Sequence, residues 1–418
     1  MLEAGVAKIK ITPPPGLELA GYGVYLNRTA KEIHDDLFAR ALLFDDGKTK
    51  TLLIVCDLCG VGRQFVMECR REISGATGIP EGNISISCTH THSGPVTVFL
   101  RGWGEMNRDY MKFLKEKIVE AAIKANENLE PAAAGAGRGK IEIGYNRVVK
   151  DGPVDTEIMV LRVDDIRGRT KAVLCNYSAH AVVGGPGNLA VSADWPGYAS
   201  AKIDNALSGG MGIFAQGCCG DVNVKDACSS SFEKMKEYGE CLAEEVLCVY
   251  KEIKLKKNLK IATNSKIINL PLQVHNQKFI EDVLNRYAEQ RKNANWERFF
   301  QEWKEDTLRE INRNVRDTLP AEVQVFVLGT EILFVMLPGE VFTRWGMEIK
   351  KLLPRKNIFV IGYANDFVGY IPDKDDFARH GYAADLVPLI CGFLHFSPDV
   401  GERLVSGVKV LIEKIHAY

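Results

Sequence analysis

The sequence predicts an α/β fold, in which a large mixed β-sheet core is flanked by helices within a single domain over residues 1–418. Segments with strand periodicity and segments with helix periodicity alternate to the end of the chain, as they do in sheets covered by helices. No internal repeat and no flexible linker marks a boundary between two domains. A hydrophobic fraction of 46% and a charged fraction of 26% are those of a globular chain that can bury a large core.

The first third of the chain opens on a strand that alternates apolar and polar residues and then enters a proline turn. Two apolar strands follow, and the sequence DGKTK between them favours a hairpin turn. A segment with helical periodicity then stops at a glycine. The elements expected here, in order, are strands 6–11, 39–46 and 51–58, a helix 65–78, a short strand 84–90 and a long helix 108–131.

The rest of the chain continues the alternation, apart from one segment of different composition. Residues 277–316 are highly charged and aromatic, which predicts one or two surface helices inserted into the domain. A solvated helical hairpin, a lid and a homo-oligomer contact are the alternative roles for this segment. The other expected elements are strands 139–148, 157–165, 171–180, 212–218, 321–340 and 357–366, and helices 195–209, 231–253 and 398–418.

Net charge and cysteine content limit the classes of protein to which this chain can belong. The formal net charge is −1, so no overall field favours a nucleic-acid partner, and the lysine-rich residues 251–260 are interpreted as a polar helix end. No apolar run is long enough for a transmembrane helix, and the N-terminus lacks the basic and apolar parts of a secretory signal. Eleven cysteines in mostly apolar surroundings are typical of free thiols. We therefore expect a cytoplasmic protein.

Two histidines one residue apart, His90 and His92, lie in ISCTHTHSGP at the end of a predicted strand. Residues i and i+2 of a strand point to the same face, so the two imidazoles can meet one metal ion, or one can bind metal while the other acts as acid or base. Ordinary hydrogen-bonded histidines at a strand end are the alternative interpretation. The pair alone does not decide between a functional and a structural role.

Other metal-ligand candidates also follow predicted strands. His180 in NYSAHAVVGGP comes after apolar residues and before a glycine loop, and Glu340 in LFVMLPGEVF follows a strand and a Pro-Gly turn. A carboxylate there is costly unless it is solvated or paired, and a cation would pair it. A helix N-terminal carboxylate is the alternative for Glu340. His34 is a second-rank candidate, and no role is assigned to His275, His395 and His416.

Six motifs occur in one order along the chain and together resemble the neutral/alkaline ceramidase superfamily of zinc amidases. The resemblance runs from ITPPPGLELAGYG to near Tyr382, which is most of the chain, and its motifs are specific only as a set. The motifs are ISCTHTHSGP, YNRVVKDGPVD, SADWPGYA, QGCCGDVN, LPGEVFTRWG and ANDFVGYIPDKDDFARHGYAAD.

The resemblance implies a Zn²⁺ cofactor and a role for each matching residue. His90, His180, Glu340 and Tyr370 would be the metal ligands. His92 would serve as acid or base beside the metal, and Arg147 and Tyr382 would face the substrate carbonyl. A core position for either tyrosine, and a surface position for Arg147, are the structural alternatives. Asp57 and Asp194 are candidates for carboxylates that orient the ligating histidines, or are turn and cap carboxylates.

Three features depart from the family pattern. The characteristic serine in a Gly-Asp-x-Ser-Pro-Asn stretch is replaced by Asn223, to which we assign substrate binding. An immunoglobulin-like C-terminal domain and a secretion signal, both found in the secreted ceramidases, are not expected here. The substrate is therefore predicted not to be ceramide itself, although an amide bond remains the expected target.

The resemblance thus implies a zinc-dependent hydrolase that cleaves a linear amide (N-acyl) bond by attack of a metal-bound water. Its expected partner is a small-molecule or lipid-like amide substrate. Two alternatives remain open from the residues: a metal-dependent esterase or lactonase on the same scaffold, and a non-catalytic binding protein that has lost the metal.

Overall fold

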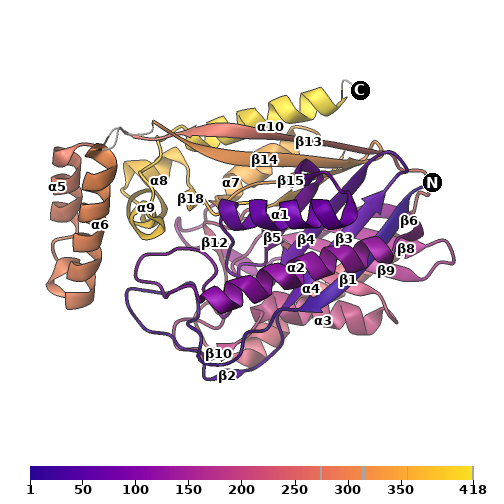
Figure 1. The fold of residues 1–418 in the computed structure, drawn as a ribbon, viewed down its shortest axis with the longest axis horizontal. Helices are drawn as coiled ribbons and strands as arrows, with labels where there is room; N and C mark the ends of the chain where they lie inside the picture. Colours follow the sequence, from indigo (N-terminus) through magenta and orange to yellow (C-terminus); the bar gives the residue numbers. More distant parts are fainter. Residues whose placement is uncertain (274, 313–316, 355, 417–418) are drawn as a thin grey trace.

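A computed structural model describes residues 1–273, 275–312, 317–354 and 356–416. Two β-sheets lie face to face in its centre, and helices cover their outer faces (Figure 1). Helices α1 to α4 pack on the larger sheet, while α7 and α10 pack on the smaller sheet. The predicted α/β class and its large mixed sheet are confirmed, and the second sheet is an addition that the sequence pattern did not separate from the first.

The larger sheet has eight strands in the order β11-β9-β8-β6-β1-β3-β4-β5. Its pairs are antiparallel except β11 with β9 and β4 with β5, so the sheet is mixed. Its strands are β1 Glu3–Lys10, β3 Phe38–Asp45, β4 Lys50–Cys56, β5 Ile84–Cys88, β6 Glu130–Lys140, β8 Glu157–Asp165, β9 Thr170–Tyr177 and β11 Met211–Gln216.

The smaller sheet has the order β13-β14-β15-β17, with only the β15–β17 pair parallel. Three two-stranded ribbons, β10-β2, β12-β7 and β16-β18, complete the β structure of the described residues. These strands are β2 Glu32–Ile33, β7 Gly144–Asn146, β10 Ala190–Val191, β12 Val222–Val224, β13 Ile261–Pro271, β14 Thr318–Leu328, β15 Ile332–Met336, β16 Glu340–Val341, β17 Asn357–Ile361 and β18 Tyr370–Ile371.

Four of the described helices, α2, α4, α5 and α8, begin at a residue whose side chain accepts a hydrogen bond from the first turn. Asn107 caps α2 by accepting from Tyr110 N, and Ser231 caps α4 by accepting from Lys234 N. The helices are α1 Arg63–Thr77, α2 Arg108–Glu127, α3 Asp194–Ala206, α4 Phe232–Glu252, α5 Gln277–Arg286, α6 Ala294–Asn312, α7 Thr343–Lys351, α8 Lys374–Ala378, α9 Val387–Cys391 and α10 Val400–His416, with short turns at Glu81–Asn83 and Gln290–Lys292 and a π-helix at Tyr382–Leu386. None of the described helices is long and apolar enough to cross a membrane.

The two sheets share a dry core made of their facing side chains. Large aromatic residues of the smaller sheet, such as Phe334 and Phe359, stack on one another at 4.8 Å between ring centroids. They pack against aliphatic residues of the larger sheet, including Leu42 and Leu161, which are buried almost completely. Strands that are apolar on both faces are expected in such a position, because one face meets helices and the other meets a sheet.

The sequence pattern misplaced one strand of the larger sheet. Residues 139–148 were predicted to form one strand, but the structure has the long strand β6 before this segment and the short strand β7 within it. Strand β6 reads EPAAAGAGRGK, and alanine and glycine favour strands weakly. Close packing explains the small residues, because a Cβ at Gly135 would lie 2.2 Å from the carbonyl oxygen of Lys254.

The charged insertion forms the helical hairpin α5–α6, which projects from one side of the molecule in Figure 1. Its apolar face is aromatic: Phe299, Phe300 and Trp303 are buried. The last residues of the predicted insertion, 313–316, lie outside the described residues, as does the end of the predicted C-terminal helix, 417–418.

Candidate metal centre

Two imidazoles and a carboxylate from distant parts of the chain meet at one buried point. His90 Nε2 lies 3.2 Å and His180 Nε2 lies 3.1 Å from the same oxygen, Oε2 of Glu340. Ligand atoms of the three residues are all within 4.8 Å of one another. Two nitrogens and a carboxylate oxygen form the donor set typical of protein zinc sites.

Backbone carbonyl groups set the orientation of both histidines. His90 follows β5 in the left-handed region, with φ 63°, and its Nδ1 lies 2.7 Å from the carbonyl oxygen of Cys59. His180 follows β9, and its Nδ1 lies 3.0 Å from the carbonyl oxygen of Val222. A hydrogen bond from Nδ1–H to each carbonyl directs the Nε2 atoms towards Glu340, and a metal ion held there would accept their lone pairs.

The structure does not give the orienting role to Asp57 or Asp194. Asp57 instead pairs with Arg40 at 2.6 Å, and Asp194 accepts hydrogen bonds from the backbone of Gly184 and Trp195. Of the two alternatives drawn from the sequence for these residues, the structure does not support the orienting role, because backbone carbonyl groups stand at that position.

Glu340 reaches the two histidines from the ribbon β16-β18, in which it stands directly opposite Tyr370. The preceding Gly339 has φ 68° and approaches the other strand closely, because a Cβ there would lie 2.3 Å from the carbonyl oxygen of Gly369. Only glycine suits both conditions. The Pro-Gly turn in the sequence therefore directs the Glu340 carboxylate towards the two histidines.

Tyr370 and Arg147 extend the cluster on the Glu340 side. The Tyr370 hydroxyl lies 3.4 Å from His180 Nε2, and Arg147 Nη2 donates to that hydroxyl at 2.6 Å. Arg147 also donates to the carbonyl oxygen of Gly220 at 2.9 Å, which fixes its guanidinium group. Tyr382 is 42% exposed, and its ring centroid lies 6.0 Å from that of Tyr370, which puts it at the rim of the cluster.

His92 and Asn223 present polar atoms without partners. His92 Nε2 lies 3.0 Å from His90 Nε2, while its Nδ1 has no hydrogen-bond partner within the described residues. The same is true of Asn223 Oδ1 on strand β12. Buried polar atoms are rarely left unpaired, so these two are available to a ligand.

The charges within the cluster favour a cation. Burial alone would raise the pKa of Glu340, but the two histidines hold it well below its ordinary value. Burial opposes the charged form of His90, yet Glu340 and Cys59 together outweigh burial and raise the pKa of His90 to about 10. Burial lowers the pKa of His180 to about 4 and that of His92 well below its ordinary value. One positive charge therefore already lies against Glu340, where a metal ion would replace a proton.

A cavity of about 150 Å³ opens onto the cluster. Seven of the eight site residues predicted from the sequence line it, and His180 completes the metal-type triad. Its other walls come mainly from apolar and aromatic side chains. The predicted residues that line it are His90, His92, Arg147, Asn223, Glu340, Tyr370 and Tyr382.

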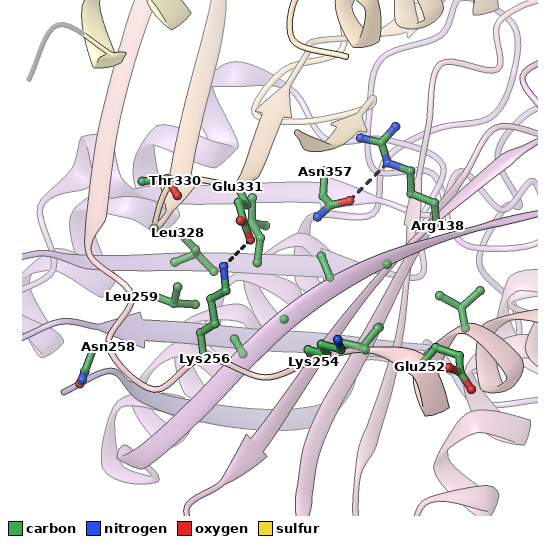
Figure 2. Close-up of a pocket in the computed structure, with 18 of the residues that line it drawn as sticks. Arg138, Glu252, Lys254, Lys256, Asn258, Leu259, Leu328, Thr330, Glu331 and Asn357 are labelled. Atoms are coloured by element: carbon green, nitrogen blue, oxygen red, sulfur yellow. Dashed lines mark hydrogen bonds and ion pairs between the residues drawn. The ribbon is translucent and has the colours of Figure 1, made fainter. Parts of the chain in front are cut away.

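A larger hollow, of about 900 Å³, lies between β6, the segment after α4 and the β14–β15 turn (Figure 2). Two of its charged side chains pair with each other, Lys256 with Glu331 at 2.6 Å, and Arg138 donates to the neutral Asn357 at 3.3 Å. Among the described residues, both groups of metal-ligand type include His90 and thus lie at the smaller cavity. The smaller cavity is therefore the candidate functional site.

Two residues of the site were missed in the sequence. The Tyr363 ring stacks on His90 with centroids 4.1 Å apart, and its hydroxyl donates to Glu340 Oε2 at 3.4 Å. Arg28 is buried and donates to the carbonyl oxygens of His92 and Asn188. Tyr363 lies near the end of a predicted apolar strand, 357–366, where an aromatic residue is usually part of a core. Nothing near Arg28 in the sequence indicates its long-range contacts.

The remaining histidines lie outside the cluster. His34 is exposed and stacks on Phe232 with centroids 3.6 Å apart. His275 and His395 were assigned no partner, but they are buried and lie 3.1 Å apart, Nε2 to Nδ1. Their contact joins the start of the α5–α6 hairpin to the segment after α9. The side chain of His416 is not among the parts of the chain that the structure describes.

The fold and the site together define an α/β protein in which side chains of the kinds that bind metal ions meet in the interior. Residues 2–265, more than half of the chain, match the family described as neutral/alkaline non-lysosomal ceramidase, N-terminal. The chain belongs to this family of hydrolases, as its motifs predicted.

Two curated relatives come from Dictyostelium discoideum. Neutral ceramidase B is 27% identical over 46% of this chain, and neutral ceramidase A is 27% identical over 40% of it. The matched regions span only 30% and 27% of those two proteins. Glu340, Tyr370 and Tyr382 lie beyond the family match, so their assignment depends on geometry and on the motif resemblance.

Solved structures match almost the whole chain. The neutral ceramidase from Pseudomonas aeruginosa has a TM-score of 0.76 and 16% identity, and the match covers 99% of this chain and 75% of that one. A structure described as ceramidase complexed with C2 has the same score and identity, with 99% and 76% coverage. At this identity the likeness establishes the fold.

Proposed function

We propose that this chain hydrolyses a linear amide bond with the help of a Zn²⁺ ion held by His90, His180, Glu340 and Tyr370. The observation that carries the proposal is the meeting of two Nε2 atoms and one carboxylate oxygen within 4.8 Å at the base of a cavity. The substrate is not expected to be ceramide itself, since Asn223 stands where the family has serine. A zinc ion in this set would polarise a carbonyl group and lower the pKa of a water molecule.

The chain's own residues then act on the substrate and on the proton. His92, which burial and His90 keep neutral, accepts a proton from the attacking water and delivers it to the leaving amine. Arg147 and Tyr382 donate hydrogen bonds to the carbonyl oxygen as negative charge develops on it. Asn223 uses its unpaired Oδ1 to accept a hydrogen bond from the substrate.

Metal analysis and a substrate panel test the proposal. Protein purified without chelators should contain one zinc per chain and should hydrolyse simple N-acyl amides, with activity lost on chelation and restored by zinc. Matched esters and lactones belong in the same panel. A preference for those over amides would contradict the amidase assignment and support the esterase alternative. A protein that binds no metal after zinc reconstitution would contradict both.

Replacement of Arg147 by glutamine tests the oxyanion role. We expect Arg147→Gln to lower kcat by about 10²-fold, the usual loss when one donor to a developing oxyanion is removed. Zinc content should fall much less than in a variant that lacks a histidine ligand, because the guanidinium group contacts one proposed ligand, Tyr370, and not the two histidines. Arg403→Gln, on the exposed face of α10, is the control and should keep full activity. Unchanged kcat in Arg147→Gln would refute the role.

A further inference from the structure

Three segments far apart in the sequence form one wall of the cavity above the metal-type cluster. We call residues 22–25, 100–103 and 387–391 the roof. Its side chains that line the cavity are apolar or aromatic for the most part: Tyr22, Leu100, Trp103, Val387, Ile390 and Cys391. The roof therefore determines how long a group can extend from the reacting carbonyl on this side.

Backbone hydrogen bonds and side-chain packing close the gaps between the roof segments. Tyr25 N donates to the carbonyl oxygen of Gly102 at 2.5 Å, and Arg101 N donates to that of Ile390 at 2.6 Å. Trp103 lies directly on Gly23, where a Cβ would come within 1.9 Å of the indole ring. A substrate chain cannot pass between the segments unless these backbone contacts break.

The α5–α6 hairpin contacts each roof segment from outside, and we call these contacts the braces. Glu302 accepts from the Tyr25 hydroxyl at 2.5 Å, and Asp306 pairs with Arg101 at 2.7 Å. The third brace acts on Asp385, in the π-helix that leads into residues 387–391. Asp385 accepts from the Tyr287 hydroxyl at 2.7 Å and pairs with Arg286. One helical hairpin thus holds the three roof segments in place relative to one another.

The cavity under the roof is small. Its volume is about 150 Å³. Pockets for drug-sized ligands usually have about 300–1,000 Å³, so this cavity lies below the usual range.

We propose that the roof restricts this site to compact amides with a short acyl group, and that the braces from α5–α6 maintain this limit. The proposal rests on the proposed function and specifies its substrate class. It also gives the charged insertion a role in specificity. The hairpin does not touch the reacting atoms; it acts through the roof.

The test compares the ethanolamides of acetic, butyric, octanoic and palmitic acids as substrates of the zinc-loaded protein, with release of the amine measured. We expect kcat/KM to be highest for acetyl or butyryl and at least about tenfold lower for octanoyl, because each methylene that a closed pocket cannot hold costs that much. Equal or higher kcat/KM for octanoyl or palmitoyl would overturn the roof proposal and leave the amidase proposal standing.

Two variants and a control attribute the limit to the roof and its braces. Ile390→Ala should raise the octanoyl-to-acetyl ratio about tenfold, and Asp306→Asn should raise it about threefold or more by loosening one brace. Glu305→Gln, on the same helix, loses only a bond to Gln301 and should leave the ratio unchanged. The ratio is measured within one preparation, so a partly unfolded variant does not distort it. An unchanged ratio in both variants would refute the proposal.

Binding provides a readout that needs no turnover. Acetohydroxamate and octanohydroxamate, which carry a zinc-chelating head on acyl chains of different length, are titrated into the zinc-loaded protein by calorimetry. Tighter binding of acetohydroxamate supports the roof limit even if no amide is hydrolysed, in which case the proposed function alone fails. Tighter binding of octanohydroxamate contradicts the roof limit.

Discussion

The His90→Ala variant is expected to lose its zinc and, with it, at least about 10³-fold of its amidase activity, equivalent to about 4 kcal/mol of transition-state stabilisation. His90 supplies one of three donor atoms that meet within 4.8 Å, and its Nε2 lies 3.2 Å from the Glu340 carboxylate. Without it, a metal ion keeps one imidazole and one carboxylate of this triad. Zinc per chain, measured by mass spectrometry after dialysis, and kcat/KM for an N-acyl amide check the prediction.

The control for this variant is a histidine outside the cluster. His34→Ala removes an exposed imidazole that contacts Phe232 and Tyr198, so zinc content and activity should both be unchanged. His180→Ala should reproduce the loss seen in His90→Ala, because the two histidines contact the same carboxylate oxygen. A His90→Ala protein that stays active with a full complement of zinc would refute the ligand assignment.

The gathering of the candidate residues in one cluster was largely predictable, because local signals mark them in the sequence. His90, His180 and Glu340 come within a few residues of the end of an apolar strand, and ordered motifs link them to Arg147 and Tyr370. What the sequence could not supply is the contacts between segments. Tyr363 was missed because its stacking on His90 depends on how two distant strands end side by side. The carbonyl groups of Cys59 and Val222 were missed because backbone atoms leave no signature in a sequence.

The fold was predictable to the level of its class and most of its elements. Apolar strands and amphipathic helices can be recognised by the period of their apolar residues. Strand β6 has no such pattern, because Gly135 and its neighbours are small so that the strand can pack against the segment after α4. The division of the strands into two facing sheets also went unpredicted. Strands buried on both faces have no polar side, so their sequences do not indicate which sheet they join.

The Asp57→Asn variant is expected to lower the free energy of unfolding by about 3–5 kcal/mol, because it leaves the Arg40 guanidinium buried without a counter-charge. The pair has a separation of 2.6 Å, and its side chains are only 3% and 1% exposed. Asparagine retains an acceptor for the backbone N–H of Phe38 but no charge. Chemical denaturation of zinc-free protein measures the change without a contribution from metal binding.

Two further variants separate the buried charge from other effects. Glu331→Gln breaks a pair with Lys256 whose side chains are each 53% exposed, and it should cost less than about 1 kcal/mol. The double variant Arg40→Met/Asp57→Leu should be more stable than Asp57→Asn, because no unpaired charge remains in the interior. Similar losses from Glu331→Gln and Asp57→Asn would contradict this account.

The same variant decides between two roles for Asp57. As an orienting partner of a zinc-bound histidine it would weaken zinc binding by about 10–100-fold when replaced. In the structure both orienting contacts come from carbonyl groups, of Cys59 and Val222, and the Asp57 carboxylate binds Arg40. Asp57→Asn should therefore bind zinc at 25 °C with nearly unchanged affinity while unfolding more easily. Weaker zinc binding by a fully folded variant would support the orienting role, which is one of the two alternatives drawn from the sequence, and would refute the role drawn from the structure.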